Sequence, residues 1–156
     1  IKSRHYAIDK ESGKTTHTNA QLAAEAIRKL DSDAFDINKT ELLACGTTLP
    51  DQLLPNHALM VHGELGIPSC EVIATAGICL SGTMSLKYGY MSVLSGQSSN
   101  AVATGSENAS SVMRAQNFEE EVEARVEKLE RQPEIAFEKD FLRWMLSDGA
   151  GAARVR

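Results

Sequence analysis

Residues 70–82 read Cys-Glu-Val-Ile-Ala-Thr-Ala-Gly-Ile-Cys-Leu-Ser-Gly, and they carry the strongest structural signal in the chain. The first part, Cys70–Thr75, is a short apolar run typical of a buried β-strand. From Cys79 to Leu94, large side chains recur at intervals of three or four, with serines and glycines between them. This spacing predicts a helix that can pack closely on more than one side. The sequence therefore predicts a strand that turns at Ala76-Gly77 into a helix.

The alternation of apolar runs and helical patterns continues on both sides of this stretch. Glu41–Gly46 and Asn100–Gly105 are two more apolar runs that suit buried parallel strands, although the periodicity of the first also suits a helix. Asn56–Leu65 has helical spacing and is ended by Gly66-Ile67-Pro68. The side chains predicted to face the core from this helix are Leu59, Met60 and Leu65.

A capping-box pattern opens an earlier helix. Thr18 stands three residues before Gln21, and the apolar residues that follow lie on one helical face. These residues are Leu22, Ala23, Ala26, Ile27 and Leu30. Before this helix, Glu11–Lys14 is typical of a turn. Strands that alternate with helices indicate an α/β fold, with a mainly parallel sheet and helices on both of its faces.

The last third of the chain has a different composition. Phe118–Gln132 combines many glutamates with a narrow apolar stripe, which predicts a solvated amphipathic helix; a partner-binding insertion is the alternative. Phe141–Leu146 is predicted to be buried. Asp148–Ala152 completes neither the dinucleotide fingerprint nor the P-loop pattern. We therefore expect a tight turn there, followed by a strand that begins near Ala153.

Composition limits the class of protein. The 156 residues are 42% hydrophobic and 24% charged, which fits one soluble globular domain. A net charge of −5 and a pI near 5.4 argue against a nucleic-acid surface. No apolar run has the length of a membrane span, and we expect a cytoplasmic protein with reduced cysteines. Because the chain begins at Ile1 without methionine, we expect it to be part of a longer protein.

Three cysteines are the candidates for chemistry. Cys45 and Cys70 lie within predicted strands and are expected to be structural. Cys79 begins the predicted helix, where the helix dipole and unpaired main-chain N–H groups favour a thiolate. A thiolate is the nucleophile of covalent acyl transfer, and such N–H groups can stabilise an oxyanion. A buried structural cysteine is the alternative for Cys79.

The histidines show neither a catalytic partner nor a metal-ligand spacing, and we expect surface positions or satisfied hydrogen bonds for them. They are His5, His17, His57 and His62.

Four segments carry a family resemblance. They are Gly66–Cys70, Ala74–Gly82, Ala103–Glu107 and Ser147–Ala152. In this order they resemble the N-terminal half of β-ketoacyl-acyl-carrier-protein synthase III, a family of the thiolase-like superfamily. The resemblance implies a thiolase-like fold, in which a mainly parallel mixed sheet with helices on both faces forms one half of an αβαβα layered architecture. Residues 1–156 would then be an N-terminal half-domain, with an acidic helical insertion at about 110–133.

The same resemblance implies an acyltransferase that forms carbon–carbon bonds in fatty-acid or polyketide-type synthesis. Cys79 would take an acyl group as a thioester from acyl-coenzyme A or an acyl-carrier protein, at the top of a buried helix. A malonyl thioester would then lose carbon dioxide, and its enolate would attack the acyl-enzyme. Ala109 falls where the family lines its acyl pocket. The resemblance further implies a homodimer and no metal or redox cofactor.

Around the nucleophile, the sequence departs from the family pattern. Gly77-Ile78 precedes Cys79 where the family usually has two alanines, and Leu80–Thr83 follows it. This departure leaves open an acyltransferase of the hydroxymethylglutaryl-coenzyme A synthase type, or a non-catalytic partner subunit of a condensing enzyme. The family's catalytic histidine and asparagine lie in its second half. We assign neither to this chain, and we expect the fragment alone to be inactive.

Overall fold

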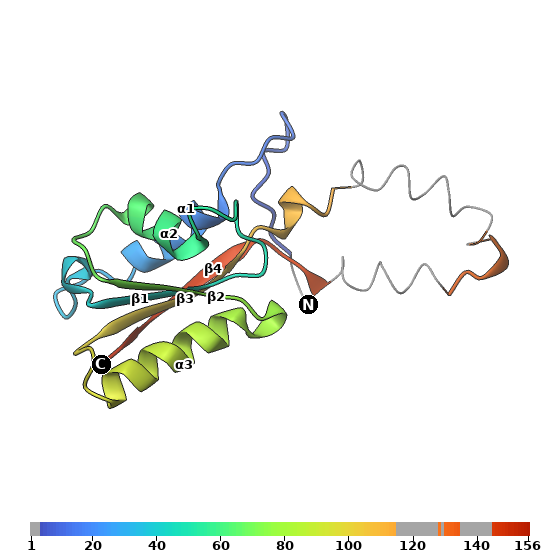
Figure 1. Ribbon diagram of the computed structural model, residues 1–156. Helices are drawn as coiled ribbons and strands as arrows, with labels where there is room; N and C mark the ends of the chain where they lie inside the picture. Colours follow the sequence, from blue (N-terminus) through green and yellow to red (C-terminus); the bar gives the residue numbers. More distant parts are fainter. Residues whose placement is uncertain (1–3, 115–127, 129, 135–144) are drawn as a thin grey trace.

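A four-stranded mixed sheet lies at the centre of the protein (Figure 1). Its strands are β1 (Leu42–Gly46), β2 (Glu71–Thr75), β3 (Ala101–Glu107) and β4 (Gly149–Val155), in the spatial order β2-β1-β3-β4. Strand β1 pairs in parallel with β2 and β3, and β4 runs antiparallel to β3. This computed structural model describes residues 4–114, 128, 130–134 and 145–156.

Helices cover both faces of the sheet. Helices α1 (Asn19–Arg28) and α2 (His57–Leu65) pack together on one face, and α3 (Ser81–Leu94) lies along the other (Figure 1). The predicted capping box begins α1: the Thr18 hydroxyl accepts from the Gln21 N–H (3.2 Å), and the Gln21 carboxamide accepts from the Thr18 N–H (3.0 Å). The described residues also include the short 3₁₀ helices η1 (Ile37–Lys39), η2 (Ile78–Leu80) and η3 (Ala109–Ser111).

The main hydrophobic core lies between the sheet and the helices α1 and α2. Full burial of an aliphatic side chain such as Leu43 or Val61 contributes about 1.5–3 kcal/mol of stability relative to exposure. The helix α1 supplies mostly alanines, which allow it to lie close to the sheet. The buried members of this core are Ala20, Ala23, Ala24, Ile27, Phe35, Leu43, Cys45, Ala58, Val61 and Val102.

Small residues, rather than large ones, form the face that α3 turns toward the sheet. The buried residues of this helix are Ser81, Ser85, Gly89 and Ser92. A Cβ atom on Gly89 would lie 3.3 Å from the Cβ of Ala101 in β3, so the helix and the sheet are close-packed there. Most large apolar side chains of η2 and α3 are exposed instead. They are Ile78, Leu80, Met84, Leu86, Tyr90, Met91 and Leu94.

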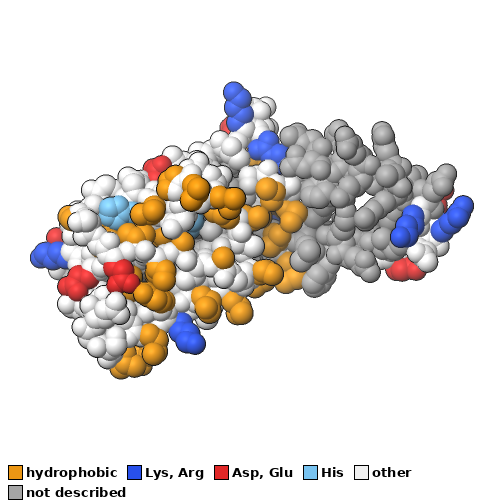
Figure 2. Space-filling view, viewed as in Figure 1, with side chains coloured by type: hydrophobic (Ala, Val, Ile, Leu, Met, Phe, Trp, Pro, Cys, Tyr) orange, Lys and Arg blue, Asp and Glu red, His pale blue; other side chains and the backbone are white. Residues whose placement is uncertain are grey.

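These exposed side chains mean that α3 is buried on only one side in this chain, whereas the family resemblance implies a buried helix. Figure 2 shows hydrophobic side chains at the surface along the lower edge of the molecule, where Figure 1 places α3.

The structure corrects two predictions for the sheet. Strand β4 begins at Gly149 rather than near Ala153, so the tight turn predicted within Asp148–Ala152 is wrong. Glycine and alanine have weak strand propensity. Residues Gly149–Val155 form a strand because β3 pairs with them over seven positions. Strand β2 is half-exposed rather than buried, because it lies at an edge of the sheet.

Other corrections concern the helices. Leu59 is 49% exposed instead of facing the core, and α2 buries His57, Ala58 and Val61. The helix predicted from Cys79 begins at Ser81, because the 3₁₀ turn η2 precedes it. The predicted acidic helix Phe118–Gln132 and the predicted buried segment Phe141–Leu146 lie largely outside the described residues. Among the residues that are described, no helix has both the length and the apolar composition to cross a membrane.

Candidate active site

The turn between β2 and α3 places Cys79 at the end of the sheet where the parallel strands finish. Ile78, the residue before it, has a φ of +52°, in the left-handed region that a β-branched side chain rarely adopts. Such a conformation costs about 1–3 kcal/mol and persists only where surrounding contacts impose it. The turn is closed by main-chain bonds from Leu80 N–H to the Gly77 carbonyl (2.9 Å) and from Ser81 N–H to the Ile78 carbonyl. The Cys79 N–H takes part in neither bond.

Hydroxyl groups hold this turn from both sides. The Ser81 hydroxyl donates to the Ile78 carbonyl (2.8 Å) and accepts from the Gly77 N–H (3.0 Å). The Thr75 hydroxyl, at the end of β2, donates to the Ser81 carbonyl (2.9 Å). From the loop after β1, the Thr48 hydroxyl donates to the Ile78 carbonyl (3.0 Å). The strained residue is therefore fixed through its carbonyl by hydroxyls from two segments.

Glycines let the start of α3 lie directly on the sheet. A Cβ atom on Gly46, at the end of β1, would lie 2.2 Å from the Ser81 carbonyl oxygen, a distance that no packing tolerates. A Cβ atom on Gly105 in β3 would lie 3.0 Å from the Cα of Gly82. The first turn of α3 is thus in contact with the backbone of two strands, and this contact sets the height of Cys79 above the sheet.

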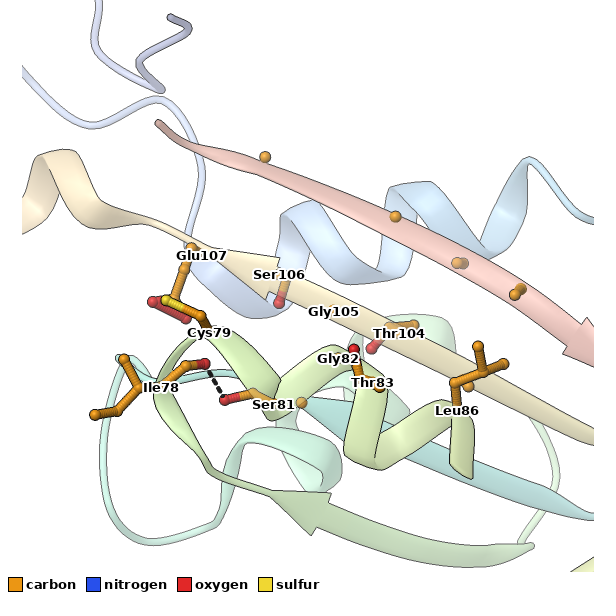
Figure 3. A pocket seen from close by; sticks show the side chains of 16 residues that line it. Ile78, Cys79, Ser81, Gly82, Thr83, Leu86, Thr104, Gly105, Ser106 and Glu107 are labelled. Carbon is orange, nitrogen blue, oxygen red and sulfur yellow. Dashed lines mark hydrogen bonds between the residues drawn. The ribbon is translucent and has the colours of Figure 1, made fainter. Parts of the chain in front are cut away.

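A cavity of about 580 Å³ opens beside this turn. It is lined by Cys79, by residues at the start of α3, and by the end of β3 with Glu107 (Figure 3). The start of β4 forms another wall, through Gly149 and Gly151. A small-molecule acyl group fits a space of this size, and the Cys79 thiol, which is exposed, can reach it.

Glu107 connects the end of β3 to the loop after β1. Its Oε1 atom accepts from the Thr47 hydroxyl (2.5 Å), the Thr48 N–H (2.6 Å) and the Leu49 N–H (3.3 Å). The Thr47 hydroxyl in turn accepts from the buried Asn19 side chain of α1 (2.8 Å). Three donors on one carboxylate oxygen make a strong, charge-assisted cluster.

Asp148 performs a similar role on the other side of the sheet end. This buried carboxylate accepts from the N–H of Ala7 (2.6 Å), from the N–H of Ser110 (2.8 Å) and from the Ser110 hydroxyl. It therefore joins the N-terminal segment and η3 to the start of β4. From the sequence, Asp148 was predicted only as part of a tight turn.

The three cysteines differ in their surroundings. Cys45 is fully buried in β1, and burial raises the pKa of its thiol to about 12. Cys70, just before β2, is partly buried, and burial also raises its pKa. These positions agree with the structural roles expected for both residues. Cys79 is the exposed thiol of the three and lines the cavity, which is where a nucleophile needs to be.

Ala109 and the histidines lie away from the cavity wall. Ala109 is buried in η3 and does not line the cavity, so its predicted place in an acyl pocket stays a prediction. His57 is buried under β3, where its Nε2 lies 3.1 Å from the Ser106 hydroxyl; burial lowers its pKa. Among the described residues, no group of three or more His, Cys, Asp or Glu side chains is arranged to hold a metal ion.

Sequence comparison finds curated relatives for most of the chain. It is 31% identical over 115 residues to a β-ketoacyl-[acyl-carrier-protein] synthase III of Neisseria gonorrhoeae, a match that covers 72% of this chain and 34% of the relative. The enzyme of the same name from Clostridium perfringens is 27% identical over 121 residues, covering 77% of this chain and 34% of the relative. The chain thus spans about one third of the length of these relatives. No family model matches it.

Solved structures share the fold. The tetronic acid condensing enzyme AbyA1 superposes with a TM-score of 0.73 at 24% identity, covering 98% of this chain and 40% of that one. The 3-oxoacyl-(acyl carrier protein) synthase III of Pseudomonas aeruginosa PAO1 gives 0.70 at 18% identity, covering 98% and 39%. OleA from Xanthomonas campestris gives 0.69 at 22% identity, covering 96% and 43%. The predicted thiolase-like α/β fold is confirmed.

Proposed function

Because the chain is homologous over 72% of its length to β-ketoacyl-[acyl-carrier-protein] synthase III, we propose that it is the cysteine-bearing part of a condensing acyltransferase of that type. The observation that carries the proposal is the exposed Cys79 on the strained turn at the start of α3, beside a cavity of about 580 Å³. The reaction is a decarboxylative Claisen condensation in fatty-acid or polyketide-type synthesis.

In the first half-reaction, the Cys79 thiolate attacks the carbonyl carbon of an acyl thioester. The bond from that carbon to the donor sulfur breaks, and the donor leaves as a thiol after it takes up a proton. The new thioester joins the acyl group to Cys79 Sγ. In the second half-reaction, a malonyl thioester loses carbon dioxide, and the resulting enolate attacks the acyl carbon. The Cys79 thiolate is released, so the nucleophile is regenerated.

The main chain around Cys79 supports this chemistry electrostatically. The tetrahedral intermediate places a negative charge on the former carbonyl oxygen, and N–H groups directed at that oxygen stabilise it. The Cys79 N–H is not used by the bonds that close the turn, and it lies at the N-terminal end of η2 and α3, where the helix dipole is positive. This N–H is therefore our candidate oxyanion donor.

The proposed reaction also needs a catalytic histidine and asparagine, which we assign to no residue of this chain. We expect the catalytic histidine and asparagine of the family in a further part of the complete protein. We also propose a homodimer in the cytoplasm that uses coenzyme A or carrier-protein thioesters and needs no metal or redox cofactor. Ala109 stays a candidate for the acyl pocket.

Covalent labelling tests the proposal. The complete protein is incubated with acyl-coenzyme A donors of several chain lengths and with acyl-carrier proteins, and its intact mass is measured. We expect an increment of one acyl group that Cys79→Ala abolishes. The matched control is Cys70→Ala, which removes another thiol that is not fully buried and should keep the increment.

Two results of this experiment would count against the proposal. If the wild-type protein takes up no acyl group from either donor class, the proposal is wrong and a non-catalytic partner subunit is supported. If the label persists in Cys79→Ala, another residue is the nucleophile.

A further inference from the structure

Two polar residues next to the candidate nucleophile have no role in the proposed chemistry. We propose that Glu107 and Thr48 are positioning residues that hold the turn bearing Cys79. Glu107 fixes the loop Thr47–Leu49, and the Thr48 hydroxyl of that loop fixes the carbonyl of Ile78. The inference deepens the proposed function and rests on it for its catalytic consequence.

The first link runs from β3 to the loop. Glu107 is the last residue of β3, and the loop follows the end of β1, the neighbouring parallel strand. One oxygen of its carboxylate receives a hydroxyl and two main-chain N–H groups from three consecutive residues. An acceptor that gathers three successive donors leaves the loop little freedom, and its negative charge strengthens each bond.

The second link runs from the loop to the turn. The Ile78 carbonyl accepts from the Ser81 hydroxyl at 2.8 Å and from the Thr48 hydroxyl at 3.0 Å. Ser81 belongs to the turn itself, so it moves with the turn. Thr48 is 30 residues away in sequence and is tied to Glu107, so it holds the turn against the sheet. A β-branched residue at φ +52° needs such external support to stay in place.

The position of the Ile78 main chain determines the position of Cys79, the next residue. Attack on a thioester requires the sulfur and the oxyanion donor to be placed together relative to one carbonyl group, and a displacement of about 1 Å costs about a hundredfold in rate. Thr48 does not line the cavity, so the loss of its hydroxyl should alter the rate of attack rather than the binding of the donor.

Four variants of the complete protein separate this role from general stability. Thr48→Val removes the hydroxyl, and Thr48→Ser restores it. Glu107→Ala removes the carboxylate, and Glu107→Gln keeps an acceptor without the charge.

The controls lie at the opposite end of β1. Thr40→Val removes a threonine hydroxyl that donates to another isoleucine carbonyl, that of Ile37 (2.7 Å). Glu41→Ala removes a carboxylate that accepts from the N–H and hydroxyl of Ser99 (both 2.8 Å).

Two measurements are made on every variant. Hydrogen exchange followed by mass spectrometry reports the protection of the peptide spanning residues 76–82. Single-turnover acylation by acyl-coenzyme A reports the maximal rate and the half-saturating donor concentration. We expect Thr48→Val and Glu107→Ala to speed exchange in this peptide by about threefold to tenfold, which is the effect of one lost hydrogen bond. Thr48→Val should slow acylation by a similar factor at an unchanged half-saturating concentration, and Thr48→Ser should restore both readouts.

The exchange measurement needs no catalytic activity, so it decides the inference even if the wild-type protein is never acylated and the proposed function fails. Wild-type exchange in Thr48→Val would overturn the link. An effect of equal size in Thr40→Val would also overturn it, because the change would then reflect general loosening. If exchange rises but the acylation rate stays at the wild-type value, the positioning role in catalysis is wrong.

Discussion

Ile78 combines backbone strain with a side chain that is 73% exposed, so little burial compensates for its conformation. Two neighbouring hydroxyls hold its carbonyl, and the next residue is the candidate nucleophile. Backbone strain of this kind is typical of active sites, where surrounding contacts impose a conformation that the reaction requires.

Relief of this strain should raise stability. In Ile78→Gly the left-handed conformation costs nothing, which gains about 1–2 kcal/mol, and the greater freedom of glycine in the unfolded chain removes about 0.5–1 kcal/mol. We expect the free energy of unfolding in urea to rise by up to about 1.5 kcal/mol. Leu53→Gly, at a residue that is 83% exposed without a positive φ, should lower it instead. Equal losses in both variants would contradict the presence of strain at Ile78.

His57 should make the protein sensitive to mild acid. Burial lowers its pKa below the ordinary 6.5, and the weaker attraction of Asp51 and Glu107 acts in the opposite direction. The folded state therefore resists protonation that the unfolded state accepts. The stability that His57 contributes is complete above pH 6.5 and is lost as the pH falls, by at most about 1.4 kcal/mol per pH unit.

Denaturation curves at several pH values between 6.5 and 5 measure this loss. His57→Gln keeps a partner for the Ser106 hydroxyl but does not titrate, so its stability should change less over this range. His62→Gln, at a histidine that is not fully buried, is the control and should behave as the wild type. If the stability of His57→Gln falls with decreasing pH as steeply as that of the wild type, another group is responsible for the loss.

At the residue scale, the sequence predicted the strand-to-helix turn on which Cys79 lies, but not the residues that support it, and the role of Cys79 as nucleophile stays a prediction. The turn was predicted because an apolar run, two small residues and a helical pattern are local signals. The roles of Glu107 and Thr48 were not predicted, because they depend on hydrogen bonds between distant segments. Glu107 binds a residue 60 positions away, and Thr48 binds one 30 positions away. The positive φ of Ile78 also left no local sign, since the residue type argues against it.

At the scale of elements, the packing of α3 on the sheet depends on glycine. Gly46→Ala would bring a methyl group within 2.2 Å of the Ser81 carbonyl oxygen, so the helix or the strand must shift. We expect a loss of about 3 kcal/mol or more, at the upper end for overpacking. Gly63→Ala is the matched control: nothing lies within 4 Å of the added methyl in α2, and the change should stabilise by about 0.5–1 kcal/mol.

Urea denaturation of the two alanine variants measures both effects. A mild effect of Gly46→Ala would mean that α3 does not rest on the end of β1.

Elements with local signals were predicted well. The capping box at Thr18 correctly predicted the residue at which α1 begins. The left-handed Gly66 ends α2 at the position that the sequence predicted. Strand β4 was misplaced, because its glycines and alanines become a strand only through pairing with β3. The inward face of α2 was misjudged for a related reason: Leu59 fits the helical pattern, but the sheet lies on the side of His57, Ala58 and Val61.

At the scale of the whole molecule, the outer face of α3 exposes several large apolar side chains. Leu86, Tyr90 and Leu94 are 45%, 55% and 65% exposed on one helix. Contiguous exposed apolar surface binds hydrophobic dyes and promotes association. We therefore expect the 156-residue chain alone to bind anilinonaphthalene sulfonate and to self-associate.

Charged substitutions on this face should weaken dye binding. Met84→Lys with Met91→Lys replaces two apolar side chains that are about half exposed, so dye fluorescence should fall. Ser95→Lys with Gln97→Lys, just beyond the helix, adds the same charge without removing apolar area and is the control. Equal fluorescence in the two double variants would mean that the dye binds elsewhere.

The antiparallel pair β3-β4 joins strands that are separated by 41 residues of chain. The entropy of closing such a long connection grows only with the logarithm of its length, so doubling it costs about 0.6 kcal/mol. By closure entropy alone, a change in the length of this connection outside η3 and Asp148 therefore alters stability little, whereas a single methyl group at Gly46 alters it greatly.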